Sequence, residues 1–265
     1  MKKSARIQSV LHAVNLQEEV TNFPSFTISE LKNVQVDIVE IATNVRLGQL
    51  IEKIVAQLIR SSSNYLLIHE NVQIIQNKQT IGELDFIIQE KATNSFFHVE
   101  FAYKFYLLDP TISSNQYDNW IGPNRKDTLR EKIEKLQEKQ FPLLYHEHTK
   151  TVLHDLHIEH ISQKLCMLAY LFIPYHFSGT IHPHYQKAIK GYYVNFPTFI
   201  ELHTPDTTYY FPPKKMWGME PSENNTWHSL PTIKATLKEQ LETNRSVLCW
   251  QKRKDVYSLF FIVWW

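Results

Sequence analysis

The sequence predicts a mixed α/β fold, and three stretches of the chain carry that prediction. Residues 47–59 place leucine, isoleucine and valine at the three- and four-residue spacing of one helix face. Residues 82–105 alternate apolar and polar side chains in two runs around a short polar loop, which is typical of two half-buried strands. Residues 176–265 add further aromatic, strand-like runs. We therefore expect a helix packed on antiparallel strands, followed by a β-rich segment.

Composition limits the classes of protein to which the chain can belong. A chain of 265 residues with 43% hydrophobic and 13% aromatic residues can bury a large core, as one elaborated domain or as two small ones. The net charge is +1, from 28 basic and 27 acidic residues, so contacts with nucleic acid would need a local basic patch. The two cysteines, Cys166 and Cys249, lie in apolar segments, where we expect buried, reduced thiols.

Neither end of the chain predicts a targeting or membrane segment. The first residues, Met-Lys-Lys-Ser, are followed by mixed polar sequence without the apolar stretch of a signal peptide. The longest apolar run, Leu259–Trp265, is too short to span a bilayer. We therefore expect a cytoplasmic protein with no membrane partner.

Shorter elements surround the helix at 47–59. An apolar stripe between residues 7 and 14 predicts a leading helix, which we expect to end at Phe23-Pro24. Residues 65–68 and 72–76 are strand-like and are divided by Glu70-Asn71. Asn77-Lys78-Gln79 then predicts a turn into the strand that begins near Gly82.

The paired runs between residues 82 and 105 place acidic side chains in register. The apolar face of the second run is expected in the core, and its other face carries His98, Glu100, Ala102 and Lys104. If residues 89–95 contain the turn, Ile88 faces Phe97, and Asp85 then lies opposite Glu100 with their Cβ atoms about 4.5–5.5 Å apart. The same register sets Glu83 against Ala102 and brings Lys104 to the end of the carboxylate row. A slip of one residue would turn Asp85 to the opposite face.

A carboxylate pair of this kind predicts a metal site. Asp85 and Glu100 would repel each other at that distance unless a proton or a cation lay between them. Carboxylate oxygens are the hard ligands that Mg²⁺ prefers, and one or two carboxylates with waters form the usual Mg²⁺ site for phosphate chemistry.

These motifs carry a family resemblance. Gly82-Glu83-Leu84-Asp85, a loop, and then Glu100 on an apolar strand with a lysine soon after resemble the restriction-endonuclease-like superfamily of PD-(D/E)XK nucleases. More narrowly, residues 82–106 followed by Trp120-Ile121-Gly122-Pro123-Asn124-Arg125-Lys126-Asp127 resemble a bacterial family, domain of unknown function 1853, which has no assigned activity.

The resemblance implies a domain organisation. It implies a restriction-endonuclease-like core over residues 45–175, built of a helix, a three-stranded antiparallel meander, a second helix and a strand. Residues 1–44 would form a helical lead-in that packs on this core. Residues 176–265 would form a β-rich, aromatic extension of the same domain.

The resemblance also implies roles for individual residues. Asp85 and Glu100 would bind Mg²⁺ or Mn²⁺, and Glu52, on the flank of the helix before the first strand, would complete the metal site. An ordinary glutamate at the rim of an amphipathic helix is the alternative for Glu52. The superfamily's lysine stands two residues after the glutamate, where this chain has Ala102, and Lys104 lies on the same face about 6.6–6.8 Å further along. Lys104 would then position or deprotonate the attacking water.

A second set of residues borders this candidate site. Glu83, His98 and Gln140 are candidate accessory residues, although a histidine one pleat above the site is as readily a structural hydrogen-bonding group.

A basic cluster precedes the second predicted helix. We expect Asn124 to cap this helix, with Leu129, Ile133 and Leu136 as its apolar stripe. Intrahelical ion pairs account for most charges on its far end, so that end is expected to be a solvated face. Arg125, Lys126 and Arg130 gather at the first turns, where a helix N-terminus also attracts phosphate, and are the candidate nucleic-acid contacts.

The remaining segments suggest structure more than chemistry. Histidines between residues 146 and 160 invite a zinc site, but their spacing drifts around a helix and no cysteine accompanies them, so we expect a solvent-exposed linker. Residues 165–173 predict a buried strand, residues 231–243 a helix, and residues 247–263 a final strand pair around a charged turn. Trp217 and Trp227 are expected to cover the sheet edge instead of stacking on bases.

These patterns favour one function and leave two others open. We expect a Mg²⁺-dependent nuclease that hydrolyses phosphodiester bonds of nucleic acid, with DNA favoured over RNA. The displaced lysine leaves a catalytically inactive nuclease-like module, which binds nucleic acid or protein, as the second hypothesis. An interaction scaffold that uses the aromatic C-terminal half, outside nucleic acids altogether, is the third.

Overall fold

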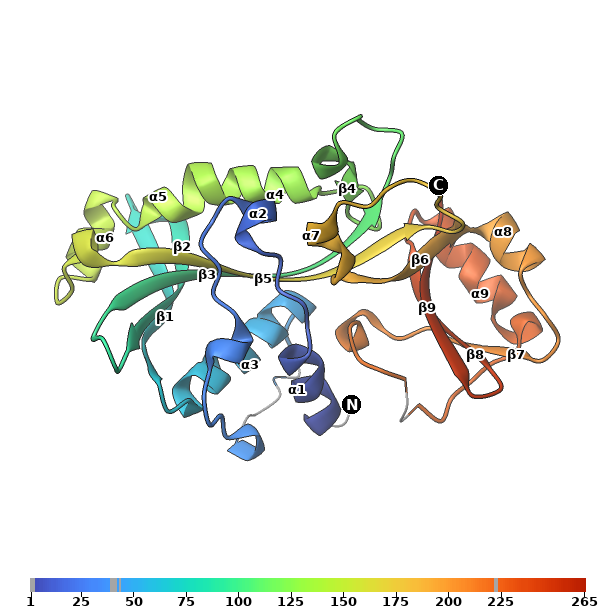
Figure 1. Ribbon diagram of the computed structural model, residues 1–265, viewed down its shortest axis with the longest axis horizontal. Coiled ribbons are helices and arrows are strands. Elements are labelled where there is room, and N and C mark those ends of the chain that lie inside the picture. Colours follow the sequence, from blue (N-terminus) through green and yellow to red (C-terminus); the bar gives the residue numbers. More distant parts are fainter. Residues whose placement is uncertain (1–2, 39–41, 43, 222–223) are drawn as a thin grey trace. The chain divides into compact units, whose positions relative to one another are not determined.

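A computed structural model describes residues 3–38, 42, 44–221 and 224–265 of the chain. These residues form a mixed α/β structure with a large, mostly antiparallel sheet and several helices (Figure 1). The described strands are β1 (Tyr65–Gln76), β2 (Gln79–Glu90), β3 (Phe96–Leu108), β4 (Trp120–Ile121), β5 (Ser162–Pro174), β6 (Ile189–Asn195), β7 (Thr207–Tyr210), β8 (Val247–Arg253) and β9 (Val256–Val263).

The helices of the described residues are mostly short. The α-helices are α1 (Lys3–Leu11), α2 (Glu18–Thr21), α3 (Leu47–Ser61), α4 (Leu129–Lys135), α5 (Phe141–Leu143), α6 (Glu147–Val152), α7 (Pro183–Gln186), α8 (Phe196–Glu201) and α9 (Leu230–Glu242). A π-helical segment, η4 (Leu136–Gln140), joins α4 to α5. The 3₁₀ turns are η1 (Ile28–Glu30), η2 (Val36–Ile38), η3 (Gln116–Asn119), η5 (Ile158–His160) and η6 (Lys214–Met216).

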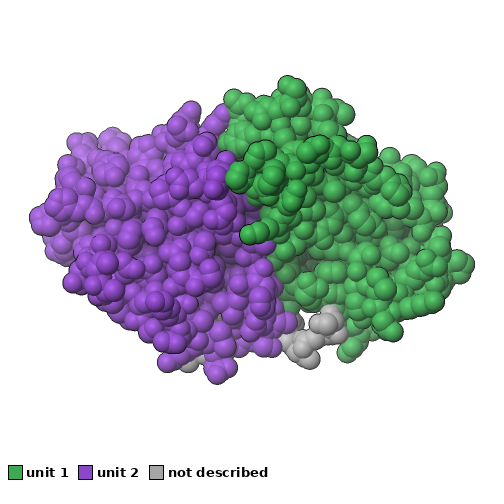
Figure 2. All heavy atoms as spheres, in the orientation of Figure 1, with its two compact units in different colours: residues 1, 105–130, 170–265 green, residues 2–104, 131–169 purple. Residues whose placement is uncertain are grey.

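The chain divides into two compact units (Figure 2). Unit 2 contains the described residues up to 104 together with residues 131–169, and unit 1 contains residues 105–130 and 170–265. Strands β3 and β5 contribute residues to both units. The strand order is β1-β2-β3-β5 in unit 2 and β5-β6-β9-β8-β7 in unit 1. The expected division into residues 1–44, 45–175 and 176–265 stays a prediction.

Helix α3 confirms the helix predicted at residues 47–59. Its apolar stripe is buried, with Leu50, Ile54 and Leu58 each at most 1% exposed, and the helix packs against β1. Glu52 lies half-buried on the flank of that stripe, because at 100° per residue it points within about 20° of Ile59 and about 60° of Val55, two buried residues at the edge of the stripe. The amphipathic pattern therefore fixes both the helix and the place of its acidic residue.

Strand β1 is continuous, so the break predicted at Glu70-Asn71 is wrong. Asn71 adopts a positive φ of 52°, which asparagine tolerates better than most residues. The pairing with β2 also shifts by one residue between Leu67 and His69, a β-bulge that bends the strand without ending it. The turn predicted after Gln76 is confirmed, because Asn77 and Lys78 both have positive φ, as a two-residue hairpin turn requires.

Two helix boundaries also differ from the sequence prediction. Helix α1 ends at Leu11 and not at Phe23-Pro24, because the following residues pair with β5: the N–H of Leu16 donates to the carbonyl of Met167 at 2.8 Å. Helix α4 begins at Leu129, so Asn124 does not cap it. The Oδ1 atom of Asn124 instead accepts the N–H of Ser246 at 2.9 Å.

Unit 1 contains the predicted C-terminal elements. Helix α9 matches the helix expected at residues 231–243, and β8 and β9 form the expected antiparallel pair with a turn at Lys254. Trp217 is buried as expected and packs against Phe261 with ring centroids 5.1 Å apart. Both cysteines, Cys166 and Cys249, are buried free thiols, which confirms the prediction.

In the part of the chain that the structure describes, we find no helix with the length and apolar character needed to cross a membrane.

Candidate metal centre

Strands β2 and β3 bring Asp85 and Glu100 together in unit 2. The register predicted from the sequence is confirmed, with Ile88 opposite Phe97 and Phe86 opposite Val99. The backbone ladder ends there, and at the next step the Oδ2 atom of Asp85 accepts the N–H of Phe101 at 2.7 Å. A side-chain acceptor thus replaces a backbone acceptor, which fixes the Asp85 carboxylate against β3.

Glu100 is the centre of a buried hydrogen-bond network. It is only 1% exposed, and His98 is fully buried. The Oε1 atom of Glu100 lies 2.9 Å from Nε2 of His98, and Oε2 accepts from Nε2 of Gln140 at 3.2 Å. Both carboxylate oxygens are therefore oriented by neighbouring side chains, and each keeps further lone-pair capacity.

The partners of Gln163 settle which nitrogen of His98 carries the proton. Nε2 of Gln163 donates to the carbonyl of Phe141 at 2.7 Å, and a carbonyl can only accept, so the orientation of this amide is determined. The same nitrogen lies 3.2 Å from Nδ1 of His98, which must then accept. The proton of His98 is therefore on Nε2 and is donated to Glu100, so His98 acts here as a positioning residue.

The π-helical segment η4 places Gln140 over the sheet. Its wider turn, closed by the N–H of Phe141 donating to the carbonyl of Leu136, inserts one residue relative to an α-helix. Gln140 then donates both to Glu100 and, at 3.4 Å, to the backbone carbonyl of Glu83. Segments of this kind are frequent at functional sites. In Figure 1, α4 and α5 run along one side of the sheet.

Two more carboxylates extend the row. Nδ2 of Asn71 donates to Oε1 of Glu52 at 2.5 Å and to Oε1 of Glu83 at 3.2 Å. Nε2 of Gln73 reaches the other oxygen of Glu83 at 3.4 Å. The side-chain amide of Asn71 therefore links helix α3 to strand β2, because it donates to one acidic side chain on each of them.

The protonation of this row is perturbed. Burial raises the pKa of Asp85 well above its ordinary value, and the negative charges of Glu100 and Glu52 raise it further, against the opposing effects of the Phe101 N–H and Lys132. Burial also raises the pKa of Glu52, as do the charges of Glu83 and Glu100, while the hydrogen bond from Asn71 opposes this. Ionisation of these carboxyl groups is therefore less favourable than in water, and a bound cation would offset that cost.

Lys132 is a member of this cluster that the sequence analysis did not identify. The charge pattern predicts a solvated face for this part of the helix, but Lys132 is half-buried: burial lowers its pKa, while the charges of Glu100 and Asp85 raise it. A signal was present in the sequence: Lys132, Leu136 and Gln140 follow at intervals of four, which places them on one helix face. That face is the one that covers the carboxylates.

Lys104 lies half-buried on β3, on the same strand face as Glu100. Its positive charge lowers the pKa of Lys132, so the two ammonium groups face the same region. The residue two positions after Glu100 is Ala102, which is buried.

No three histidine, cysteine, aspartate or glutamate residues of the described chain are arranged so that they could hold a metal ion together. Any ion at this place would depend on fewer protein ligands, chiefly Asp85 and Glu100.

In the histidine-rich segment, Nδ1 of His146 accepts the N–H of His148 at the start of α6, and the side chain of His154 is 74% exposed.

The predicted nucleic-acid contacts belong to unit 1 and are already paired in part. Only Arg130 lies in helix α4, because Arg125 and Lys126 occupy the turn before it. The guanidinium groups of Arg125 and Arg130 form ion pairs of 2.8 Å with Asp109 and Asp118. Arg125 also stacks on Trp265, 4.6 Å from the ring centroid.

With this fold and this acidic cluster, the chain is a mixed α/β protein in which a half-buried Asp85 and a buried Glu100 come from two neighbouring antiparallel strands. Residues 3–255 match the family described as Domain of unknown function (DUF1853), and the chain belongs to that family. No curated protein and no solved structure matches the chain.

Proposed function

We propose that this protein is a metal-dependent nuclease that hydrolyses phosphodiester bonds of nucleic acid. The observation that carries the proposal is the cross-strand pair of Asp85 and Glu100, held by the Phe101 N–H, His98 and Gln140 within a wider acidic row. Helix α3, the antiparallel strands β1, β2 and β3, helix α4 and strand β5 follow in this order, with β4 between β3 and α4 and with α5 and α6 between α4 and β5, and β5 lies next to β3. This arrangement supports a restriction-endonuclease-like core.

The donor set fits Mg²⁺ or Mn²⁺. Hard cations of this kind use one or two carboxylates together with waters and substrate phosphates, so a pair of ligands suffices. Hydrogen bonds such as those from Gln140 and His98 to Glu100 are usual around carboxylates that ligate a metal. Asp85 and Glu100 would hold the ion, and Glu52 and Glu83 would keep the region negative. A bound Mg²⁺ makes a coordinated water more acidic and neutralises charge on a phosphate.

Two lysines are candidates for the remaining role, which is to orient the attacking water and to compensate charge on the phosphate. Lys104 shares the strand face of Glu100, one pleat pair beyond the superfamily position at Ala102. Lys132 reaches the same carboxylates from helix α4. We assign the positioning role to Lys104 and charge compensation to Lys132.

The cleavage assay tests these roles directly. Full-length protein is incubated with mixed DNA and RNA substrates over a titration of Mg²⁺ and Mn²⁺. Lys104→Ala and Lys132→Ala should each reduce cleavage by about 100-fold or more, a typical loss for a group that stabilises a transition state. Lys139→Ala, an exposed lysine of the same helical run, is the matched control and should keep full activity. Absence of cleavage with every metal and substrate would refute the nuclease proposal.

The nucleic-acid partner, with DNA favoured over RNA, has its own test. Neutralising Arg125, Lys126 and Arg130 should weaken binding and flatten its dependence on salt, each lost phosphate contact reducing the logarithmic slope by about 0.7–0.9. Arg125 and Arg130 would have to exchange their carboxylate partners for phosphate, which adds to the salt dependence. Binding by the wild type that does not change with salt would rule out this phosphate-contacting surface.

A catalytically inactive module is the second candidate function. Ala102 at the superfamily's lysine position favours it, because the fold and the carboxylates can persist after a catalytic lysine is lost. Metal binding and salt-dependent nucleic-acid binding without any cleavage is the result that would select this function.

A further inference from the structure

We propose that unit 1 carries a second and separate site, a cavity that binds the phosphate and the base of a phosphorylated nucleoside. The cavity has a volume of about 770 Å³, within the range of roughly 300–1,000 Å³ that is usual for small-molecule sites. All of its lining residues belong to unit 1, so the proposal is independent of the candidate metal centre.

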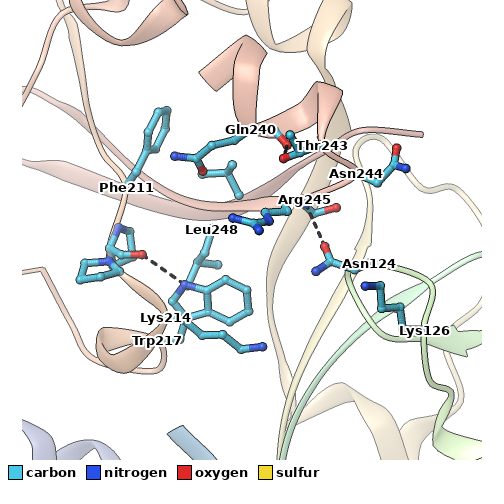
Figure 3. Close-up of a pocket in the computed structure, with 14 residues that line it drawn as sticks. Asn124, Lys126, Phe211, Lys214, Trp217, Gln240, Thr243, Asn244, Arg245 and Leu248 are labelled. Carbon is cyan, nitrogen blue, oxygen red and sulfur yellow. Dashed lines mark hydrogen bonds between the residues drawn. The ribbon is translucent and has the colours of Figure 1, made fainter. Parts of the chain in front are cut away.

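The charged side chains that line the cavity are all positive. Lys126, Lys214 and Arg245 line it, and none of the described lining residues is acidic. Figure 3 shows these three side chains around the same opening, each from a different segment of the chain. Three positive charges that are not balanced within the lining create a positive potential, which favours a dianion such as a phosphate monoester.

The position of Arg245 follows from the end of helix α9. Asn244 adopts a positive φ of 57°, its N–H donates to the carbonyl of Leu241, and the N–H of Arg245 donates to the carbonyl of Gln240. These two bonds form a Schellman motif, which also satisfies the last carbonyls of the helix. Arg245 therefore leaves the helix at a fixed angle, and the negative end of the helix dipole is partly capped.

The other two cations are held just as locally. Lys126 lies in the loop closed by the N–H of Gly122, which donates to the carbonyl of Asp127 at 2.7 Å. The side chain of Asn124 connects that loop to Ser246, the residue just before β8, by accepting its N–H. Lys214 follows a pair of prolines, whose fixed φ angles limit the motion of the segment.

The floor of the cavity is apolar and aromatic. Trp217 and Phe211 line it together with Leu248. The Trp217 ring is fixed, because its indole N–H donates to the carbonyl of Pro212 at 3.2 Å and its other contacts bury it to 9% exposure. The amino group of Lys214 lies 5.5 Å from the centroid of this ring. An inorganic anion alone would leave this apolar surface wet, whereas a nucleoside base would cover it.

Cations at the rim and aromatic groups beneath them thus match the two halves of a nucleotide. The ligand can be a free mononucleotide or the 5′-phosphorylated end of a nucleic-acid strand, since both present the same chemistry. Neither source depends on the nuclease proposal.

Calorimetric titration of the full-length protein tests the site, in low salt with a chelator so that any metal-dependent reaction is suppressed. The probes are AMP, adenosine, inorganic phosphate, and a short deoxyadenosine oligonucleotide with and without a 5′-phosphate. AMP should bind at least about tenfold more tightly than adenosine or phosphate alone, because it uses both halves of the cavity. Tight binding of AMP indicates a free nucleotide, whereas tight binding only of the 5′-phosphorylated oligonucleotide indicates a strand end.

The variants Lys214→Gln and Arg245→Gln should each weaken the preferred probe about fivefold to tenfold, a modest loss because both side chains are exposed. Lys190→Gln, an exposed lysine of β6 outside the lining, is the matched control and should change affinity by less than about twofold. The proposal is overturned if inorganic phosphate binds as tightly as AMP, or if the oligonucleotide binds equally with and without its 5′-phosphate while AMP does not bind. An equal loss in Lys190→Gln, or no binding of any probe, would also overturn it.

Discussion

Replacing Asp85 with asparagine is expected to remove the response to metal while leaving the metal-free protein at least as stable. The Oδ1 atom of asparagine can still accept the N–H of Phe101, which Asp85 accepts at 2.7 Å. The change removes a negative charge that faces Glu100 and Glu52, and burial disfavours that charge already. The variant therefore deletes a metal ligand without breaking the contact between β2 and β3.

The size of the expected response follows from mass action. A metal at one hundred times its Kd that binds only the folded state stabilises it by about 2.7 kcal/mol. For domains of roughly 150–250 residues, each kcal/mol raises Tm by about 2–4 °C. The wild type should therefore gain roughly 5–10 °C in saturating Mn²⁺ or Mg²⁺, and Asp85→Asn should gain close to nothing.

Differential scanning calorimetry of chelator-treated protein, with and without each metal, is the assay. Asp155→Asn is the matched control, because Asp155 is an exposed aspartate of the same unit whose side chain is 82% exposed. It should show the full wild-type shift. The reasoning would be wrong if Asp85→Asn kept that shift, if the wild type showed none, or if the metal-free variant melted well below the wild type.

Three further outcomes follow from the same site. Because the pKa of Asp85 is raised in the folded protein, the folded state binds more protons than the unfolded state. The metal-free wild type should therefore lose stability relative to Asp85→Asn as pH rises above about 4. Parallel urea titrations of the two proteins would measure this loss. Gln140→Ala should weaken metal binding about tenfold in calorimetry by releasing Glu100, whereas the exposed neighbour Gln137→Ala should not. In cleavage assays, Ala102→Lys/Lys104→Ala should recover part of the activity that Lys104→Ala loses; full activity of Lys104→Ala would show that this lysine is not required.

Local periodicity was sufficient to predict the elements in which the spacing of apolar residues reports which face is buried. Helix α3 and the register of β2 with β3 could be predicted, because a helix face repeats every 3.6 residues and a strand face every second residue. Since that register also sets which side chains oppose each other, placing the turn within residues 89–95 together with the alternation was enough to predict that Asp85 approaches Glu100. The conformation of the Asn77-Lys78 turn was equally local.

Other features depend on contacts between segments that are distant in the sequence, and no local pattern could predict them. Asn71 looked like the end of a strand, but pairing with β2 over its whole length continues β1 through the positive φ. Asn124 looked like a helix cap, but its side chain binds Ser246, 122 positions away. Periodicity records which face of an element is buried and not what covers it, so the place of Lys132 beside Glu100 emerged only from the fold, whereas Gln140 was already a candidate accessory residue. The same reason hid the cavity of unit 1, whose cations come from three separate segments.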